Sequence, residues 1–240
     1  MPITITILGI TVGVSAVMLK AVGKTVESKF RSWKQQRAEK NRFENINRVA
    51  SKNQVSTSIL SPCHLAVLGD VEAGKTTLIR ALQGTINFNK GVSAQTPYVA
   101  FEFPIRYNGG QRIIKGHDFS GSEKFIESYY EDEIKRCDCL FYICNVNEYL
   151  NNGIKREGNN ARLHLIDQYL SNRSIPIQII LTYASQVHDR DDARLKFMES
   201  IRSKPYGGRF LERQPIVIEM KDDVELKNLI EAIKKVLFKI

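Results

Sequence analysis

The sequence predicts an α/β protein in which a mostly parallel six-stranded sheet carries helices on both faces and follows a transmembrane helix. Short apolar runs of strand length alternate with helical patterns from residue 64 to the end of the chain. A glycine-rich turn joins the first of these strands to the first of these helices, and an uncharged apolar run precedes them all. We expect an anchor over residues 1–23, a basic helix or linker over residues 24–60 and a folded domain over residues 61–240.

The amino-terminal run, residues 2–19, has no charged side chain and is rich in Ile, Val, Leu and Thr. As a helix with a rise of about 1.5 Å per residue it spans about 27 Å, slightly short of a typical hydrocarbon core. Lys20 can extend its ammonium group to the interface, so residues 1–23 are expected to cross a membrane. A cleaved signal peptide is one alternative, although no basic region precedes the run. A β-rich packing segment is another, because Thr and Ile alternate at residues 3–7.

Most of the positive charge follows this run. Residues 20–53 hold ten Lys and Arg against three Glu, a net +7 of the +9 on the chain. The positive-inside rule therefore places the carboxyl-terminal side in the cytoplasm. Residues 24–50 have the pattern of a basic amphipathic helix, which either lies on anionic lipid or is a solvated spacer. We expect membrane lipid to be contacted through residues 1–50, and no nucleic-acid partner, because the charge does not belong to the folded domain.

The four cysteines do not form the pair of pairs that is typical of a structural metal site. Cys137 and Cys139 are one residue apart, and Cys144 lies in an apolar run, with Cys63 far from them in sequence. We interpret all four as buried, reduced thiols of a cytosolic domain.

Residues 69–77 have the spacing of a phosphate-binding loop, a Gly followed by four residues and then Gly-Lys-Thr. Glycines permit the tight turns that aim backbone N–H groups at a phosphate, and the next helix adds its positive end. Lys75 is expected to reach the β and γ phosphates, and the Thr76 hydroxyl to bind Mg²⁺. A plain glycine-containing loop is the alternative, but a strand at 64–68 and a helix at 77–83 supply the context that the motif requires. The expected nucleotide contacts here are Gly69, Asp70, Glu72, Ala73, Gly74, Lys75, Thr76 and Thr77.

The remaining elements follow in order. Residues 98–107 alternate apolar and polar side chains and predict a strand that Pro104 confines to an edge of the sheet. Asn108-Gly-Gly110 predicts a hairpin turn into a partner strand at 111–119. Buried strands are expected at 139–146, 175–181 and 215–220, helices at 161–171, 191–203 and 224–240, and a polar insertion at 148–160. In such sheets ligands bind at the carboxyl ends of the strands, where the glycine-rich turn lies.

Two further segments offer groups to Mg²⁺ and to a γ-phosphate. Asp118, at a strand end, can support the Mg²⁺ shell, and Gly121 offers a backbone N–H near the γ-phosphate; a surface turn is the alternative. Thr96, just before the edge strand, supplies a second hydroxyl to Mg²⁺ or is a turn residue. His117, directly before Asp118, is a packed or solvated residue, or else it reaches the water that would attack a bound γ-phosphate.

Taken together, residues 69–77, Gln95-Thr96-Pro97 and Asp118-Phe-Ser-Gly121 resemble the Ras-like small GTPases, which are P-loop NTPases. They are most similar to the ADP-ribosylation-factor type and to the β subunit of the signal recognition particle receptor, which also combines one amino-terminal span with a Ras-like domain. The resemblance covers residues 64–240. It implies that Thr96 lies in switch I and residues 119–135 in switch II, that GTP or GDP binds with Mg²⁺, and that an unidentified partner protein binds the switch regions.

Two motifs depart from the family pattern. Ser122 stands where the family has the glutamine that orients the attacking water. Thr182-Tyr-Ala-Ser185 stands where guanine is read by Asn/Thr-Lys-x-Asp, so the aspartate acceptor is missing, although plastid import-receptor GTPases carry a similar Thr-His-Ala-Gln. The last family motif keeps only Lys221. The expected base contacts are therefore Thr182, Tyr183, Ser185 and Lys221.

The resemblance implies a membrane-anchored, cytoplasm-facing GTP-binding protein that hydrolyses GTP slowly and acts as a switch or assembly factor. Lys75, Thr96, Gly121 and Ser122 are the residues expected to serve hydrolysis, and Thr76, Thr96 and Asp118 those expected to serve Mg²⁺. A non-hydrolysing, nucleotide-bound scaffold is one alternative, because Ser122 replaces the glutamine. An ATPase is another, because the missing aspartate leaves the base undetermined.

Overall fold

The structure, a computed structural model, describes residues 3–7, 10–14, 58–85, 98–119 and 123–239. The chain divides into two units, Met1–Ser56 and Thr57–Ile240. In the first unit, β1 (Ile3–Ile7) and β2 (Ile10–Val14) pair antiparallel, with Ile3 opposite Val14.

This hairpin corrects the prediction of a transmembrane helix for residues 3–14. The segment alternates Ile with Thr and is rich in β-branched side chains, which favour a pleated strand over a helix. Among the residues described, no helix is both long and apolar enough to cross a bilayer. The rest of the expected anchor, residues 15–23, and the basic helix at 24–50 lie outside the described residues, so membrane attachment stays a prediction.

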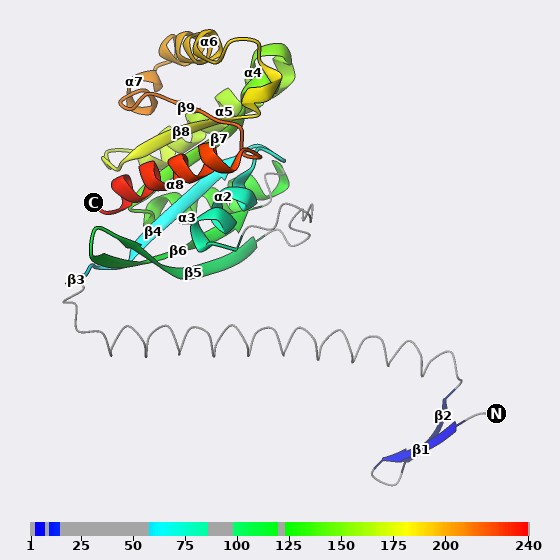
Figure 1. The fold of residues 1–240 in the computed structure, drawn as a ribbon. Coiled ribbons are helices and arrows are strands. Elements are labelled where there is room, and N and C mark those ends of the chain that lie inside the picture. The colour runs from blue at the N-terminus through cyan, green and yellow to red at the C-terminus, as the bar shows by residue number, and fades with distance from the viewer. Residues whose placement is uncertain (1–2, 8–9, 15–57, 86–97, 120–122, 240) are drawn as a thin grey trace. The chain divides into compact units, whose positions relative to one another are not determined.

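The second unit is built on one sheet with strand order β5-β6-β4-β7-β8-β9 (Figure 1). Every neighbouring pair in it is parallel except β5 and β6. The six expected strands are present, and a short seventh, β3, pairs with the start of β6. The strands are β3 (Ser58–Ile59), β4 (Cys63–Gly69), β5 (Tyr98–Tyr107), β6 (Gly110–Phe119), β7 (Cys139–Asn145), β8 (Ile177–Thr182) and β9 (Ile216–Val217).

Helices cover both faces of this sheet (Figure 1). On one face, α2 (Lys75–Gln83) and α8 (Asp223–Leu237) bury an apolar stripe against β4 and β6. On the other, α3 (Glu123–Arg136) and α5 (Gly153–Leu170) share a core with α6 (Arg190–Arg202) and α7 (Gly207–Phe210). The α/β class and the layers predicted from the sequence are therefore confirmed.

The β5–β6 hairpin forms the edge of the sheet, as Pro104 predicts, because β5 pairs with β6 alone among the described strands. Its turn is made by Asn108 and Gly109, with φ of 47° and 76°. Two successive positive φ values are what a two-residue hairpin turn requires, so the turn prediction is confirmed.

The prediction of a polar insertion at residues 148–160 is wrong, because this stretch is helical. The side chains of Asn145 and Asn152 cap α4 (Val146–Asn151) and α5, accepting hydrogen bonds from backbone N–H groups of their first turns. Asn159 and Asn160 are buried, and their Oδ1 atoms accept hydrogen bonds from two tyrosine hydroxyls, those of Tyr142 and Tyr149. The asparagines that suggest a loop in the sequence are thus caps and buried acceptors.

All four cysteines are buried free thiols, as the sequence predicts. Burial raises the pKa of Cys137 to about 12 and the pKa of Cys144 even further. At neutral pH neither thiol supplies a thiolate nucleophile.

Candidate nucleotide-binding site

The glycine-rich loop lies at the carboxyl end of β4, between Gly69 and the first turn of α2. Gly69 has φ 144°, and a Cβ added there would lie 2.0 Å from the Ile143 carbonyl oxygen of β7. Gly74 has φ 105° and forms the N-cap of α2. Both positions therefore require glycine, one for a close backbone approach and both for their backbone conformation.

The amino end of α2 has no capping side chain among the described residues. Its N-cap, Gly74, accepts nothing through a side chain, and its first turn contains no acidic residue. By contrast, Asp189 and Asp222 cap α6 and α8 with their carboxylates. The first N–H groups of α2 and its positive dipole end are thus without a side-chain acceptor, which is the arrangement that binds phosphate.

Lys75 lies folded over the loop. It is buried, and its Nζ donates hydrogen bonds to the carbonyl oxygens of Gly69 and Asp70, at 3.2 and 2.5 Å. Burial lowers the pKa of Lys75 to about 8, while the charges of Asp118 and Asp70 act to raise it. An ammonium group held in this way adds positive charge to a ring of backbone amides.

Thr76 and Asp118 meet where α2 begins and β6 ends. The Thr76 hydroxyl donates to Asp118 Oδ2 at 2.7 Å. Asp118 Oδ1 is buried and has no hydrogen-bond partner among the described residues. Burial raises the pKa of Asp118, against the hydrogen bond from Thr76 and the charge of Lys75. A hydroxyl beside a carboxylate with an unused oxygen is an oxygen donor set that suits Mg²⁺.

Thr182, at the end of β8, ties the loop to the sheet. Its hydroxyl lies 2.8 Å from the Ala73 carbonyl oxygen and 3.2 Å from that of Cys144, and its side chain is buried. Tyr183, the next residue, is in the left-handed conformation, and its hydroxyl donates to the Glu72 carbonyl oxygen at 2.9 Å. The motif that the sequence assigns to base contact therefore also supports the phosphate loop.

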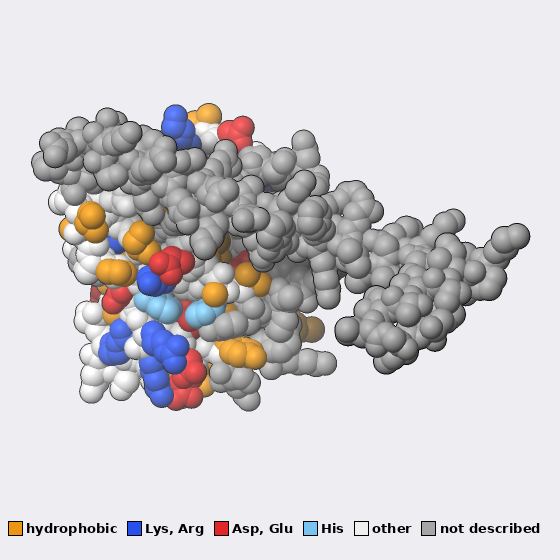
Figure 2. All heavy atoms as spheres, turned by 90° about the horizontal axis from the view of Figure 1, so that it is seen from below, with side chains coloured by type: hydrophobic (Ala, Val, Ile, Leu, Met, Phe, Trp, Pro, Cys, Tyr) orange, Lys and Arg blue, Asp and Glu red, His pale blue; other side chains and the backbone are white. Residues whose placement is uncertain are grey.

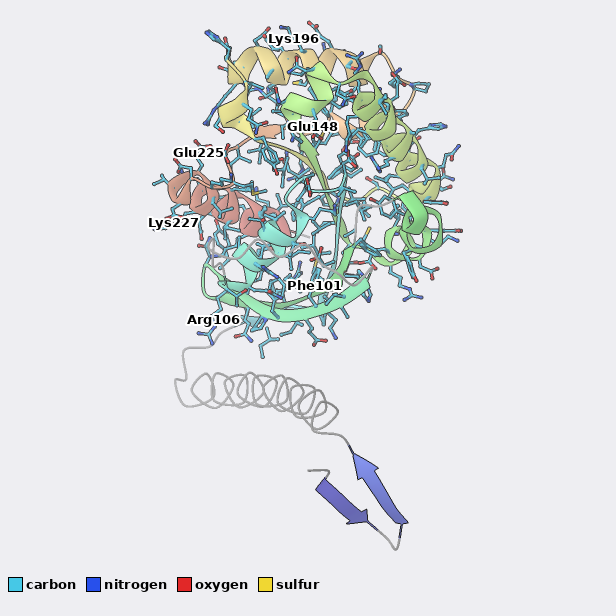
Figure 3. All side chains as sticks on the ribbon, turned by 90° about the vertical axis from the view of Figure 1, so that its right-hand side faces the viewer. Phe101, Arg106, Glu148, Lys196, Glu225 and Lys227 are labelled. Atoms are coloured by element: carbon cyan, nitrogen blue, oxygen red, sulfur yellow. The ribbon has the colours of Figure 1, made fainter. Side chains whose placement is uncertain are left out.

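Ser185, an expected base contact, is bound to Glu219, which was not expected in the site. Both the backbone N–H and the hydroxyl of Ser185 donate to Glu219 Oε2, at 3.2 and 2.6 Å, and the Lys221 N–H donates to Oε1. Burial acts to raise the pKa of Glu219, but these hydrogen bonds outweigh it and the pKa is lowered. Glu225 on α8, labelled in Figure 3, accepts a hydrogen bond from the Glu219 N–H and fixes this turn. Sequence reasoning missed Glu219 as a candidate base contact.

Asp70, an expected nucleotide contact, directs its side chain toward α5. Its carboxylate is buried and pairs with Lys155 at 3.2 Å and Arg162 at 3.3 Å, both on α5. It also accepts the hydrogen bond of the Val71 N–H at 2.7 Å. The side chain therefore anchors the loop to α5, and nothing in the local sequence of Lys155 or Arg162 indicates that contact.

Of the other expected residues, Thr77 lies on α2 directly after the metal-binding candidate Thr76. Thr96, Gly121 and Ser122 lie outside the described residues, so their roles stay predictions. Lys221 is exposed beside Glu219. His117 projects to the face of β6 opposite Asp118, and its Nδ1 lies 2.8 Å from Glu133 Oε2.

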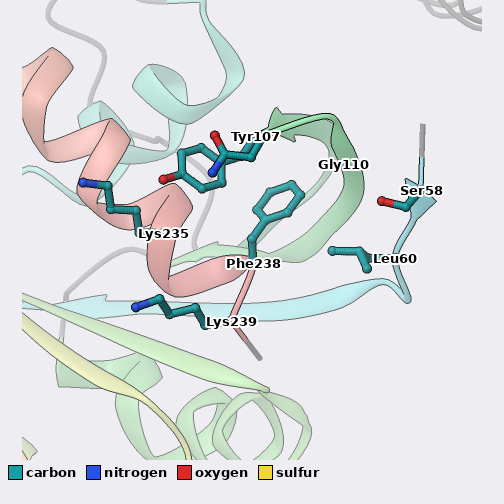
Figure 4. A pocket seen from close by; sticks show the side chains of 8 residues that line it. Ser58, Leu60, Tyr107, Gly110, Lys235, Phe238 and Lys239 are labelled. Carbon is teal, nitrogen blue, oxygen red and sulfur yellow. The ribbon is translucent and has the colours of Figure 1, made fainter. Parts of the chain in front are cut away.

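A separate cavity of about 390 Å³ lies beside the β5–β6 turn, at the end of the sheet opposite the loop (Figure 4). The rings of Tyr107 and Phe238 line it together with Lys235 and Lys239. It adjoins the turn at which β6 begins, whereas ligands of open parallel sheets bind at the carboxyl ends of the strands. We therefore place the candidate site at the loop.

No family model matches this chain, and no curated protein matches it.

Proposed function

We propose that this chain binds a guanine nucleotide with Mg²⁺ at the loop between β4 and α2, in the manner of a Ras-like GTPase. The observation that carries the proposal is the 2.7 Å hydrogen bond from Thr76 to Asp118. It joins the helix after the loop to the end of the neighbouring strand, which is where a nucleotide-bound Mg²⁺ needs oxygen ligands. The strand order around the loop supports the same proposal.

The phosphates would be held by backbone N–H groups of residues 69–76 and by Lys75. Mg²⁺, when bound, supplies charge neutralisation to the phosphate oxygens. On the protein side, the Thr76 hydroxyl would contact the metal, and Asp118 would support it with the oxygen that has no partner among the described residues. Lys75 would exchange its bonds to the loop carbonyls for bonds to phosphate.

For the base, we propose that Glu219 takes the place of the missing aspartate. Guanine presents two N–H donors on one edge, and a carboxylate is the acceptor that pairs with them. The Thr-Tyr-Ala-Ser motif contains no carboxylate. The Glu219 carboxylate, however, accepts a hydrogen bond from the Ser185 hydroxyl, and the pKa of Glu219 is lowered. Tyr183 would stack on the base.

The expected turnover is slow. Ser122 is too short to bridge water and γ-phosphate as a glutamine does, so a partner protein at residues 119–135 would supply the missing group. A protein of this kind acts as a switch or an assembly factor.

Residues 1–50 would attach it to a membrane with its second unit in the cytoplasm. Carbonate extraction shows whether that attachment is peripheral, in which case the full chain is released, or integral, in which case it is retained.

The nucleotide proposal is tested on the full-length chain by heat release and identification of the bound nucleotide, followed by calorimetry on the stripped protein. Lys75→Ala should abolish measurable affinity for GTP and GDP. Lys196→Ala is the matched control, because Lys196 is an exposed lysine on α6 (Figure 3). Equal affinity in the parent and in Lys75→Ala would contradict the phosphate site.

The base assignment is tested in the same assay. Wild type should prefer GTP to ATP, and Glu219→Gln should reduce that preference roughly 10-fold or more, as expected for a lost hydrogen bond to a charged group. Glu212→Gln is the control, since Glu212 is exposed and lies outside the site. ATP binding as tight as GTP would favour the ATPase alternative. Tight GTP binding without any turnover would favour the scaffold.

A further inference from the structure

On the face of β6 that is opposite Asp118, two histidines and a glutamate from three elements meet. His64 lies on β4, His117 on β6 and Glu133 on α3. His64 Nε2 lies 3.0 Å from Glu133 Oε1, and His117 Nδ1 lies 2.8 Å from Glu133 Oε2. One nitrogen of each imidazole and the carboxylate all lie within 4.8 Å of one another. Figure 2 shows histidine side chains together at the surface of this face, among Lys and Arg side chains.

The fold fixes this arrangement. β4 and β6 are parallel neighbours with His64 opposite Lys115, so His64 and His117 project to the same face. The backbone of His64 is held by Asp138, which exchanges two hydrogen bonds of 2.7 Å with it. Glu133 is held by the His117 N–H, which donates to Oε1 at 3.2 Å. Three well-oriented side chains are therefore presented by two strands and one helix.

Burial distinguishes this cluster from a surface charge group. The Glu133 side chain is 3 % exposed, whereas those of His64 and His117 are 23 % and 17 % exposed. A buried carboxylate is costly unless it is paired or coordinates a metal. The two imidazole rings are partly exposed, so the cluster can be reached from solvent. Lys115, on the same face, is paired with Glu102 at 3.4 Å.

We infer that His64, His117 and Glu133 form a binding site for a transition-metal cation of the Zn²⁺ class. Two imidazole nitrogens and one carboxylate suit Zn²⁺, whereas Mg²⁺ and Ca²⁺ prefer oxygen alone. Ligand atoms at about 2.0–2.2 Å from a tetrahedral ion are about 3.3 Å apart. The nitrogen–oxygen separations of 3.0 and 2.8 Å, each to a different oxygen of Glu133, are a few tenths of an ångström below this value, and the three ligand atoms lie within 4.8 Å of one another.

The protons balance without an outside reactant. Each imidazole binds the metal through the nitrogen that faces Glu133, and its proton moves to the outer ring nitrogen. Glu133 binds as a carboxylate, and water completes the shell. No step depends on a nucleotide, so this inference stands independently of the proposed function.

The metal would fasten α3 to the two strands that lead into the candidate nucleotide site. β4 ends at Gly69 and β6 carries Asp118 next to His117. Tyr130, one turn before Glu133 on α3, has its hydroxyl 3.4 Å from the Gly69 N–H nitrogen. A cation at this position would therefore stabilise α3, the helix whose Tyr130 contacts the start of the glycine-rich loop.

The test uses the full-length chain after treatment with a chelator, titrated with Zn²⁺ by calorimetry and with Co²⁺ by visible absorption. Wild type should bind one ion per chain and give the bands of four- or five-coordinate Co²⁺ without the charge-transfer band of thiolate ligation. Glu133→Gln and His117→Gln should each lower the affinity for Zn²⁺ by at least 10- to 100-fold, because the loss of a residue that only contacts a metal ligand already costs that much. Glu131→Gln and His188→Gln should bind as wild type does, because Glu131 is only partly buried, His188 is exposed, and both lie outside the cluster.

Thermal unfolding in chelator shows that each variant folds, and Zn²⁺ should raise the unfolding temperature of wild type and the two controls alone. If a cluster variant does not fold, the Co²⁺ spectrum of wild type decides. Equal affinity in wild type and cluster variants, a thiolate spectrum, or no binding at millimolar Zn²⁺ would each overturn the inference and leave a metal-free hydrogen-bonded cluster.

Discussion

Thr182→Val tests whether the end of β8 holds the glycine-rich loop in place. Valine has nearly the volume of threonine, so the change removes the hydroxyl with little change in packing. The Thr182 side chain is 1 % exposed, and its Oγ1 lies 2.8 Å from the Ala73 carbonyl oxygen and 3.2 Å from that of Cys144. One hydroxyl proton serves one of these acceptors at a time, so one hydrogen bond is lost and a buried carbonyl is left without it.

The expected destabilisation is about 1–3 kcal/mol, the cost of leaving a buried polar group unsatisfied. Urea unfolding of the full chain measures it as a lower midpoint with an unchanged slope. Because Ala73 is a loop residue, the affinity for GTP should fall in parallel, about tenfold for each 1.4 kcal/mol of distortion. Thr182→Ser, which keeps the hydroxyl, should retain more of the affinity.

Thr85→Val is the matched control, because the Thr85 hydroxyl is exposed and lies 3.4 Å from its acceptors. It should stay within about 0.5 kcal/mol of wild type. An equally small change for Thr182→Val, with unaltered nucleotide affinity, would refute the reasoning that this hydroxyl positions the loop.

Three further predictions concern the glycine-rich loop, a buried thiol and the rate of hydrolysis. Gly69→Ala should prevent formation of the native loop, because its Cβ would lie 2.0 Å from the Ile143 carbonyl oxygen, whereas Gly84→Ala, with open space around it, should cost only about 1–2 kcal/mol for its positive φ; thermal unfolding separates them. Burial raises the pKa of Cys137 from 9.0 to about 12, so the stability that it contributes is complete below pH 9 and lost as pH rises toward 12. Denaturant midpoints should therefore fall above pH 9, and less so in Cys137→Ala; an identical decline would contradict this. Ser122→Gln should raise the single-turnover rate of GTP hydrolysis, and rapid hydrolysis by wild type would show that another residue places the water.

Local signals explain what could be predicted from the sequence. The motif formed by Gly69, Gly74 and Lys75 is recognised by its local spacing, and the structure has the strand, loop and helix that the spacing predicts. Asn108 and Gly109 likewise define a two-residue turn by their own φ values. Such features need no knowledge of distant contacts.

Contacts between distant elements explain what could not be predicted. His64 and Glu133 are 69 residues apart, and Asp70 pairs with Lys155 across 85 residues, so no local pattern brings either pair together. Asn159 and Asn160 were expected in a loop because asparagine favours turns, but two buried tyrosine hydroxyls make them internal acceptors on α5. At residues 3–14 apolar composition predicted a helix, whereas β-branching produced a hairpin.

The most direct test of the nucleotide site is the Mg²⁺ dependence of GTP affinity in the stripped full-length chain. The affinity of wild type for GTP should be much higher in Mg²⁺ than in chelator, because Thr76 and Asp118 offer the oxygen atoms that would hold the metal beside the phosphates. Asp118→Asn should lose most of that Mg²⁺-dependent increment, while Asp192→Asn, on the exposed surface of α6, should keep it. GTP affinity that is the same with Mg²⁺ and with chelator, or no GTP binding at all, would contradict the account.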